Sequence, residues 1–166
     1  MKKPIVSLLG ASLALLAALL IPTSCGTSNP EEAGYDAMQA GDYGKAASLH
    51  ETALEEAEPG SEKAHQLSVA RCQSLAHIDP KACQEEFLGL GAKGLELNRK
   101  DFEDVATALM SVTAYEQAAH VVAGGIDKFP DSKRLPEYLT KLKSLASSGE
   151  VPGLDAALTG LGYGAE

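Results

Sequence analysis

Residues 33–59 read AGYDAMQAGDYGKAASLHETALEEAEP, and this stretch decides the fold. It predicts two short helices joined by a tight turn at residues 40–43. Small residues recur at helical spacing, where two helices can approach closely: Gly34, Ala37, Ala46 and Ala53. Gly41 is suited to ending the first helix, because glycine adopts left-handed backbone conformations without a steric penalty. The stretch therefore predicts a helical hairpin.

The same pattern returns twice more along the chain, each time 36 residues further on. Two positions hold small residues in all three copies and are predicted contact points between helices: Ala46, Ala82 and Ala118, and then Ala53, Gly89 and Gly125. Gly34 is predicted to serve the same purpose in the first helix. Residues 114–130 form the most regular copy, whereas the second copy has Gln66 and Glu86 at positions that favour large side chains. A unit repeated in this way predicts a stack of similar hairpins.

This pattern resembles the tetratricopeptide repeat, in which a helix turns through Gly-Asp-Tyr into a second helix that carries Ala, Ala-Leu and a final Pro. The first copy has these residues at 41–43, 46, 53–54 and 59. The resemblance covers roughly residues 30–145. It implies an all-α fold of stacked antiparallel hairpins, an α-solenoid of about three repeats plus a capping helix over residues 132–146.

Residues 1–24 are predicted to be an export signal, because two lysines precede 17 uncharged, mostly apolar residues. Seventeen residues are also close to the shortest membrane span, so an uncleaved anchor is the alternative. The segment ends in small residues before Cys25, which resembles a lipoprotein cleavage site where the cysteine is acylated. Pro22 departs from the leucine usual there, and the alternative is that Cys25 belongs to a plain linker. The lipoprotein interpretation predicts an exported protein anchored in the bacterial cell envelope, at the outer membrane or in the periplasm.

The composition favours packed helices and an acidic surface. Hydrophobic residues make up 45% of the chain, mostly Ala and Leu, and there is no Trp. Removing residues 1–24 would delete two lysines and none of the 23 acidic residues, so the net charge would change from −9 to −11. Such a charge repels nucleic acid, and no nucleic-acid partner is expected. The predicted layout is a lipidated tether at 25–29, a helical-repeat domain at 30–148, and a Gly-rich tail at 149–166 with a short helix from 152 to about 159.

Several patterns that suggest chemistry have plainer interpretations. Residues 89–94 match G-x-G-x-x-G, but no strand precedes them, so they predict a helix end and a loop. Cys72 and Cys83 are predicted to form a disulfide in an exported chain, with two buried free thiols as the alternative. Their spacing with His77 fits no common zinc site. No catalytic residue, metal site or cofactor is predicted, and His50, His65 and His120 are expected to be packing or surface residues.

The resemblance also implies a binding surface, because the first helix of each pair lines the concave side of such a stack. Transferring the repeat frame gives these candidates: Glu31, Tyr35, Met38, Gln39, Leu67, Arg71, Ser74, Glu103, Thr107, Met110 and Lys143. Tyr35 and Arg71 are the strongest, because Tyr and Arg are common at binding hot spots. The set suits an extended peptide, which predicts a non-enzymatic scaffold that holds a protein partner. The alternatives are a groove that is only solvated or is filled by the tail, a structural or stress-related envelope protein without a dedicated ligand, and an accessory subunit of an envelope enzyme.

Overall fold

The computed structural model describes residues 29–164, which contain eight α-helices, one short 3-10 helix and no strand. The predicted export signal and the lipidation at Cys25 lie outside the described residues. In chain order the elements are α1 (Pro30–Gln39), α2 (Tyr43–Glu56), α3 (Glu62–Ala76), α4 (Pro80–Gly89), η1 (Gly91–Lys93), α5 (Arg99–Ser111), α6 (Tyr115–Lys128), α7 (Arg134–Ser148) and α8 (Leu154–Gly160). The all-α prediction is confirmed. Within this range, no helix is both long enough and apolar enough to cross a membrane.

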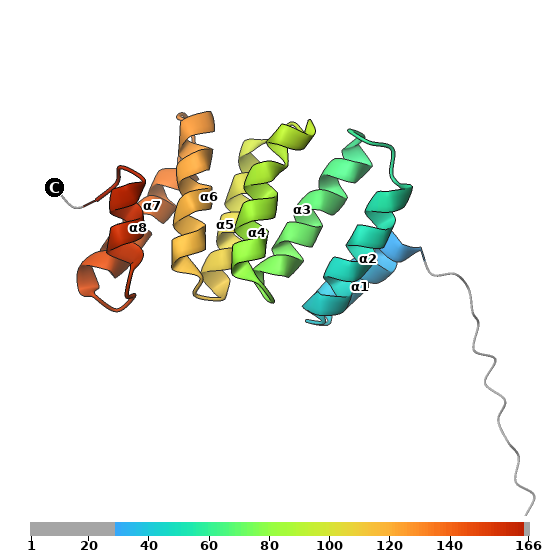
Figure 1. The fold of residues 1–166 in the computed structure, drawn as a ribbon, viewed down its shortest axis with the longest axis horizontal. Helices are drawn as coiled ribbons and strands as arrows, with labels where there is room; N and C mark the ends of the chain where they lie inside the picture. Colours follow the sequence, from blue (N-terminus) through green and yellow to red (C-terminus); the bar gives the residue numbers. More distant parts are fainter. Residues whose placement is uncertain (1–28, 165–166) are drawn as a thin grey trace, which may run out of the picture.

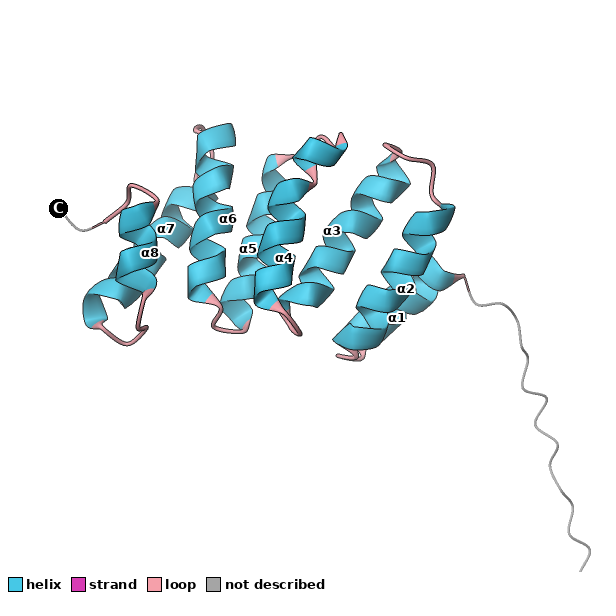
Figure 2. Ribbon diagram, viewed as in Figure 1, coloured by secondary structure: helices cyan, strands magenta, loops and turns pink. Residues whose placement is uncertain are grey.

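The helices follow one another in a row from α1 at one end to α8 at the other (Figure 1). Short loops join them, as Figure 2 shows. Consecutive helices pack as hairpins: α1 on α2, α3 on α4, α5 on α6, and α7 on α8. Helix α2 also packs on α3 and α6 on α7, while α3 contacts α5 and α4 contacts α6. The result is an all-helical stack in which the odd-numbered helices are the first of each pair.

Polar side chains cap the starts of α1 to α5. The side chains of Asn29, Ser61 and Asp79 accept hydrogen bonds from backbone N–H groups at the starts of α1, α3 and α4. Asn98 and Asp101 form a capping box at the start of α5, in which each side chain accepts from the other's backbone N–H. Each such cap stabilises the helix by about 1 kcal/mol.

Five of the seven predicted contact positions do bring helices together. Ala46, Ala53 and Ala118 are at most 1% exposed. A Cβ on Gly34 would lie 2.6 Å from Cδ2 of His50, and a Cβ on Gly125 would lie 2.9 Å from Cδ1 of Leu135. At both glycines a helix approaches its neighbour more closely than any side chain allows.

The predictions for Ala82 and Gly89 are wrong. Ala82 is only half-buried, and a Cβ on Gly89 would meet nothing within 4 Å. The buried positions are the next residues along, Cys83 and Leu90, which are 0% and 3% exposed. Helices α2 and α4 begin 37 residues apart, and α4 and α6 begin 35 apart, so the spacing of 36 is an average. A slip of one residue turns a side chain by about 100° around a helix, which moves the predicted face of α4 away from its neighbours.

The C-terminal tail forms part of the stack. Helix α8 packs on α6 and α7, and its Leu154 and Leu158 are 0% and 2% exposed. The predicted short helix is therefore present, with its start two residues later than expected. The last hairpin is complete, rather than a single capping helix, and α8 covers the apolar end of the row.

Candidate functional site

Three pockets lie side by side along the first helices of the hairpins. The central pocket, of about 470 Å³, is lined by residues of α1, α3 and α5 and by Tyr43 at the start of α2. It shares Gln73 and Asp104 with a second pocket of about 330 Å³, here called the His65 pocket. It shares Thr107 with a third pocket of about 320 Å³ between α5 and α7, here called the Arg134 pocket. Because they share walls, the three pockets form one continuous groove.

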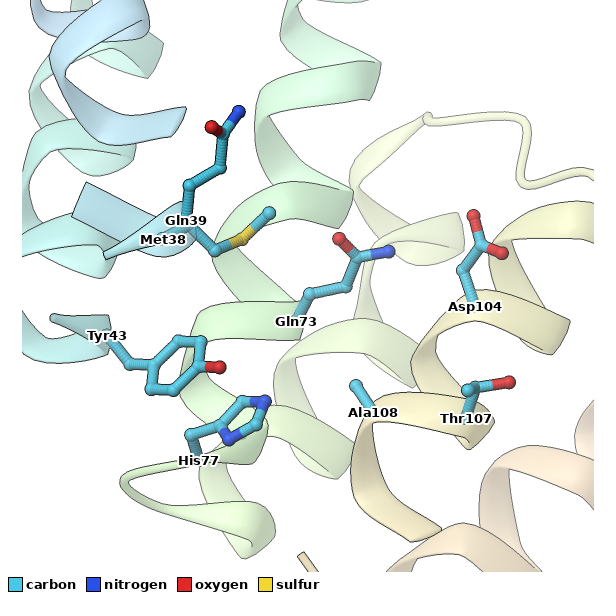
Figure 3. Close-up of a pocket in the computed structure, with 8 residues that line it drawn as sticks. All are labelled: Met38, Gln39, Tyr43, Gln73, His77, Asp104, Thr107 and Ala108. Carbon is cyan, nitrogen blue, oxygen red and sulfur yellow. The ribbon is translucent and has the colours of Figure 1, made fainter. Parts of the chain in front are cut away.

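The central pocket combines apolar and polar surfaces (Figure 3). The rings of Tyr43 and His77 stack with their centroids 3.6 Å apart and their planes 6° apart. Burial lowers the pKa of His77, which favours the neutral ring at this contact. Met38 reaches in from α1, and its sulfur accepts a hydrogen bond of 3.5 Å from the hydroxyl of Ser74. Asp104, Thr107 and Ala108 line the opposite wall on α5.

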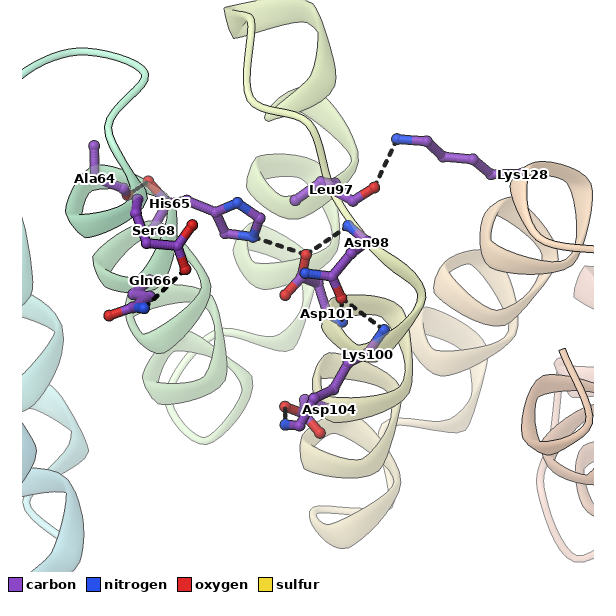
Figure 4. A network of polar contacts seen from close by, with 11 residues as sticks. Ala64, His65, Gln66, Ser68, Leu97, Asn98, Lys100, Asp101, Asp104 and Lys128 are labelled. Carbon is purple, nitrogen blue, oxygen red and sulfur yellow. Dashed lines mark hydrogen bonds and ion pairs between the residues drawn. The ribbon is translucent and has the colours of Figure 1, made fainter.

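A polar network holds the two sides of the His65 pocket together (Figure 4). Nε2 of His65 on α3 lies 2.8 Å from Oδ2 of Asp101 on α5. The same oxygen accepts a hydrogen bond of 2.7 Å from the backbone N–H of Asn98. The hydroxyl of Ser68 donates to the carbonyl of Ala64 at 2.7 Å. The His65–Asp101 pair is therefore a tie between two helices that also places a carboxylate at the cap of α5.

The Arg134 pocket is built around Tyr138 of α7. The Tyr138 hydroxyl and Oγ1 of Thr107 are 2.7 Å apart, which fixes the ring against α5. The Arg134 guanidinium lies over this ring, 5.5 Å from its centroid. Met110, Ser111 and Lys141 complete the lining. The pocket therefore presents a cation on an aromatic ring, beside a thioether and a second cation.

Five of the predicted groove residues line these pockets. They are Tyr35, Met38, Gln39, Thr107 and Met110. Of the two strongest predictions, Tyr35 lines the His65 pocket, but Arg71 lines none of the three pockets. The prediction for Arg71 is therefore wrong. Its guanidinium instead pairs with Glu86 of α4, and it lies 3.5 Å from Glu51 of α2. Arg71 therefore points toward the second helices and ties three helices together on that side.

Other predictions on the first helices also differ from the structure. Lys143 lies beside Asp155 and Tyr163 in a small pocket of about 80 Å³, where the C-terminal segment meets α7. Leu67 and Ser74 are 0% exposed, and Glu103 is 9% exposed. On α3 the repeat frame is one residue out of register, so that Gln66 and Gln73 line the groove in place of Leu67 and Ser74.

The sequence does contain a signal for the missed groove residues of α3. Gln66, Gln73 and His77 are polar residues at spacings of seven and four, which places them on one face of a helix. The contact of Arg134 with Tyr138 also has a local signal, because the two residues are four apart on one helix. The stacking of His77 on Tyr43 joins α3 to the start of α2, so it depends on the tertiary arrangement and has no signature in the local pattern.

Cys72 and Cys83 are free thiols in the structure, which corrects the predicted disulfide. Both side chains are 0% exposed. Burial raises the pKa of Cys83 to about 12 and raises that of Cys72 further. Because the thiolate is the species that attacks and forms disulfides, both groups are protected from oxidation while the helices remain packed.

The remaining sequence patterns have structural roles. Gly89 ends α4, and residues 91–93 form the 3-10 helix, so the G-x-G-x-x-G stretch is a helix end followed by a loop, as predicted. Among residues 29–164, no three His, Cys, Asp or Glu side chains are grouped so as to hold a metal ion. His50 is 0% exposed, and neither of its ring nitrogens has a hydrogen-bond partner in this part of the chain.

Comparison of the chain with protein-family models, with curated proteins and with solved structures found no match. The resemblance to tetratricopeptide repeats therefore stays a prediction from the sequence pattern.

Proposed function

We propose that this protein is a non-enzymatic scaffold that binds a protein or peptide segment in the groove along α1, α3, α5 and α7. One observation carries the proposal: three pockets share their walls and so offer one elongated surface rather than a single enclosed cavity. An extended peptide occupies such a surface by placing successive side chains in successive pockets.

The chemistry of the groove supports a peptide. Met38 and the stacked rings of Tyr43 and His77 offer apolar contact, and aromatic and methionine side chains are enriched in protein interfaces. The amides of Gln39 and Gln73 can each donate to and accept from a peptide backbone. For a groove of this length we expect micromolar affinity, about −8 kcal/mol.

The scaffold is proposed to work at a membrane of the bacterial cell envelope. We propose that the chain is exported, cleaved before Cys25 and anchored to a membrane through lipid on that cysteine. Intact-mass analysis of the protein from a bacterial envelope should then show the loss of residues 1–24 together with an acyl adduct. A Cys25→Ala variant should remain unprocessed. Cleavage and membrane retention of that variant would contradict the lipid anchor without affecting the groove.

Site-specific cross-linking tests the groove directly. A photoreactive amino acid replaces Gln73 in the central pocket or, as the matched control, the exposed Glu55 of α2, which lines none of the three pockets. Illumination of living cells should yield one recurrent cross-linked partner from position 73 and not from position 55. The partner should disappear when Met38→Asp is added, because a charge is then placed among apolar contacts. A partner captured only from position 55 would show that another face binds.

A further inference from the structure

The groove is unevenly charged along its length. Three cations line it, and Lys100 pairs with Asp104. Within residues 29–164, Arg134 and Lys141 form no ion pair. Glu137 lies on the same helix and also forms no ion pair with either of them. In a chain with a net charge of −9, this end of the groove holds two positive charges that no carboxylate of the described residues pairs with directly.

Helix geometry places both cations on the same side of α7. Arg134, Tyr138 and Lys141 are spaced by four and three residues, so their side chains lie on one face. The Tyr138 ring is fixed by its 2.7 Å contact with Thr107, and Arg134 lies over that ring. The ring limits the conformations of the guanidinium, which lowers the entropy lost when it binds an anion. The guanidinium fork is then available to a carboxylate, with Lys141 beside it.

The other end of the groove has the opposite character. Glu62, Asp101 and Asp104 line the His65 pocket, with Lys100 as the one lysine or arginine among its lining residues. A carboxylate is therefore repelled there and attracted to the Arg134 pocket. Between the two ends, Met38, Ala108 and the stacked rings of Tyr43 and His77 offer an apolar surface.

From this charge pattern we propose that the groove selects an extended peptide segment with an apolar side chain in the central pocket and a carboxylate in the Arg134 pocket. This inference rests on the proposed function and adds the chemistry and the orientation of the partner. The carboxylate is an Asp or Glu side chain of the segment, because a segment that runs along successive pockets places a side chain in each of them.

Selection from a synthetic library of short random peptides tests the proposal. The library is made in two forms, with a C-terminal amide and with a free C-terminal carboxylate, and is selected on protein expressed from the full sequence. Enrichment of Asp or Glu near an apolar residue in the amide form identifies a side-chain carboxylate. Enrichment only in the free-carboxylate form would place the C-terminus of a partner in the pocket and overturn the assignment to a side chain.

The double variant Arg134→Gln with Lys141→Gln should bind the selected peptides about tenfold or more weakly, mainly through faster dissociation. Its matched control is Lys45→Gln with Lys93→Gln, which removes the same charge from exposed positions outside the groove and should bind as wild type. Thermal melts of both variants report whether the helices remain packed.

The outcomes separate the two proposals. Selected peptides that lack acidic residues and bind the double variant as well as wild type overturn the carboxylate site and leave the groove intact. A similar loss in both double variants shows a general charge effect and also overturns the site. Selected peptides that are insensitive to Met38→Asp, or no enrichment in either library, contradict the groove itself.

Discussion

Helices α1 and α2 meet through small residues, whereas α5, α6 and α7 meet through large apolar ones. The first contact uses the buried residues Gly34, Ala37, Ala46 and Ala53, and Gly34 lies against the ring of His50. The second uses Phe102, Val105, Leu109, Val122, Leu135 and Leu142, all of which are at most 4% exposed. Phe102 also packs edge-on against Phe87 and Phe129, with ring centroids 5.0 and 5.8 Å apart.

The first hairpin and the later helices share one arrangement but are stabilised to very different degrees. Burying a leucine or phenylalanine side chain contributes about 1.5–3 kcal/mol, while alanine and glycine contribute little. The first hairpin also buries the two unpartnered nitrogens of His50, and each such group costs about 1–3 kcal/mol. The free energy of unfolding is therefore concentrated between α3 and α8, and the first hairpin is the weaker end.

The largest expected effect comes from the centre of the apolar core. Phe102→Ala should lower the free energy of unfolding by about 3–5 kcal/mol, because it leaves a cavity beside Phe87 and Phe129. Urea unfolding followed by circular dichroism measures this change. Ile78→Ala is the control, since Ile78 is 52% exposed and its loss should cost less than about 0.5 kcal/mol. Equal effects of the two variants would contradict the proposed distribution of stability.

The next effect tests the close helix contacts. Gly34→Ala and Gly125→Ala should each cost about 1–3 kcal/mol, because the new methyl group meets His50 or Leu135 below normal contact distance. Gly89→Ala places its methyl group in open space and should be neutral or stabilise α4 by up to about 1 kcal/mol. If Gly89→Ala is as costly as the other two, the repeat spacing of 36 residues holds after all and the register in the structure is wrong.

The smallest expected effect is a pH dependence of the first hairpin. Burial lowers the pKa of His50, against an opposing influence of Glu31, so the unfolded chain takes up a proton before the folded one does. The contribution of His50 to stability is thus complete above the unfolded pKa of about 6.5 and decreases as the pH falls toward the lower, folded value. The difference in unfolding free energy between wild type and His50→Leu should change across this window. A constant difference would mean that His50 is hydrated in solution.

The sequence predicted most of the fold because the signals for it are local. The close contacts at Gly34 and Ala118 follow from small residues at helical spacing, and the end of α1 follows from the left-handed backbone of Gly41. The groove was predicted only in part because it depends on which face of each helix turns inward. In the second unit the predicted register is off by one residue. The prediction therefore placed Ser74 in the groove where the structure has Gln73. It also placed Arg71 in the groove, although Arg71 pairs with Glu86 on the side of the second helices.

The joint between the second and third hairpins has a mechanical consequence. Elsewhere a second helix packs directly on the next first helix, but here residues 90–98 intervene, and the halves meet through α3 with α5 and α4 with α6. The central pocket straddles this seam, with Gln73 on one side and Thr107 on the other. A segment bound across the seam would oppose bending of the row there, because bending would break its contacts with one of the two halves. Binding in the groove and bending at the seam are then coupled, because a ligand that binds one bend of the row better than another favours that bend.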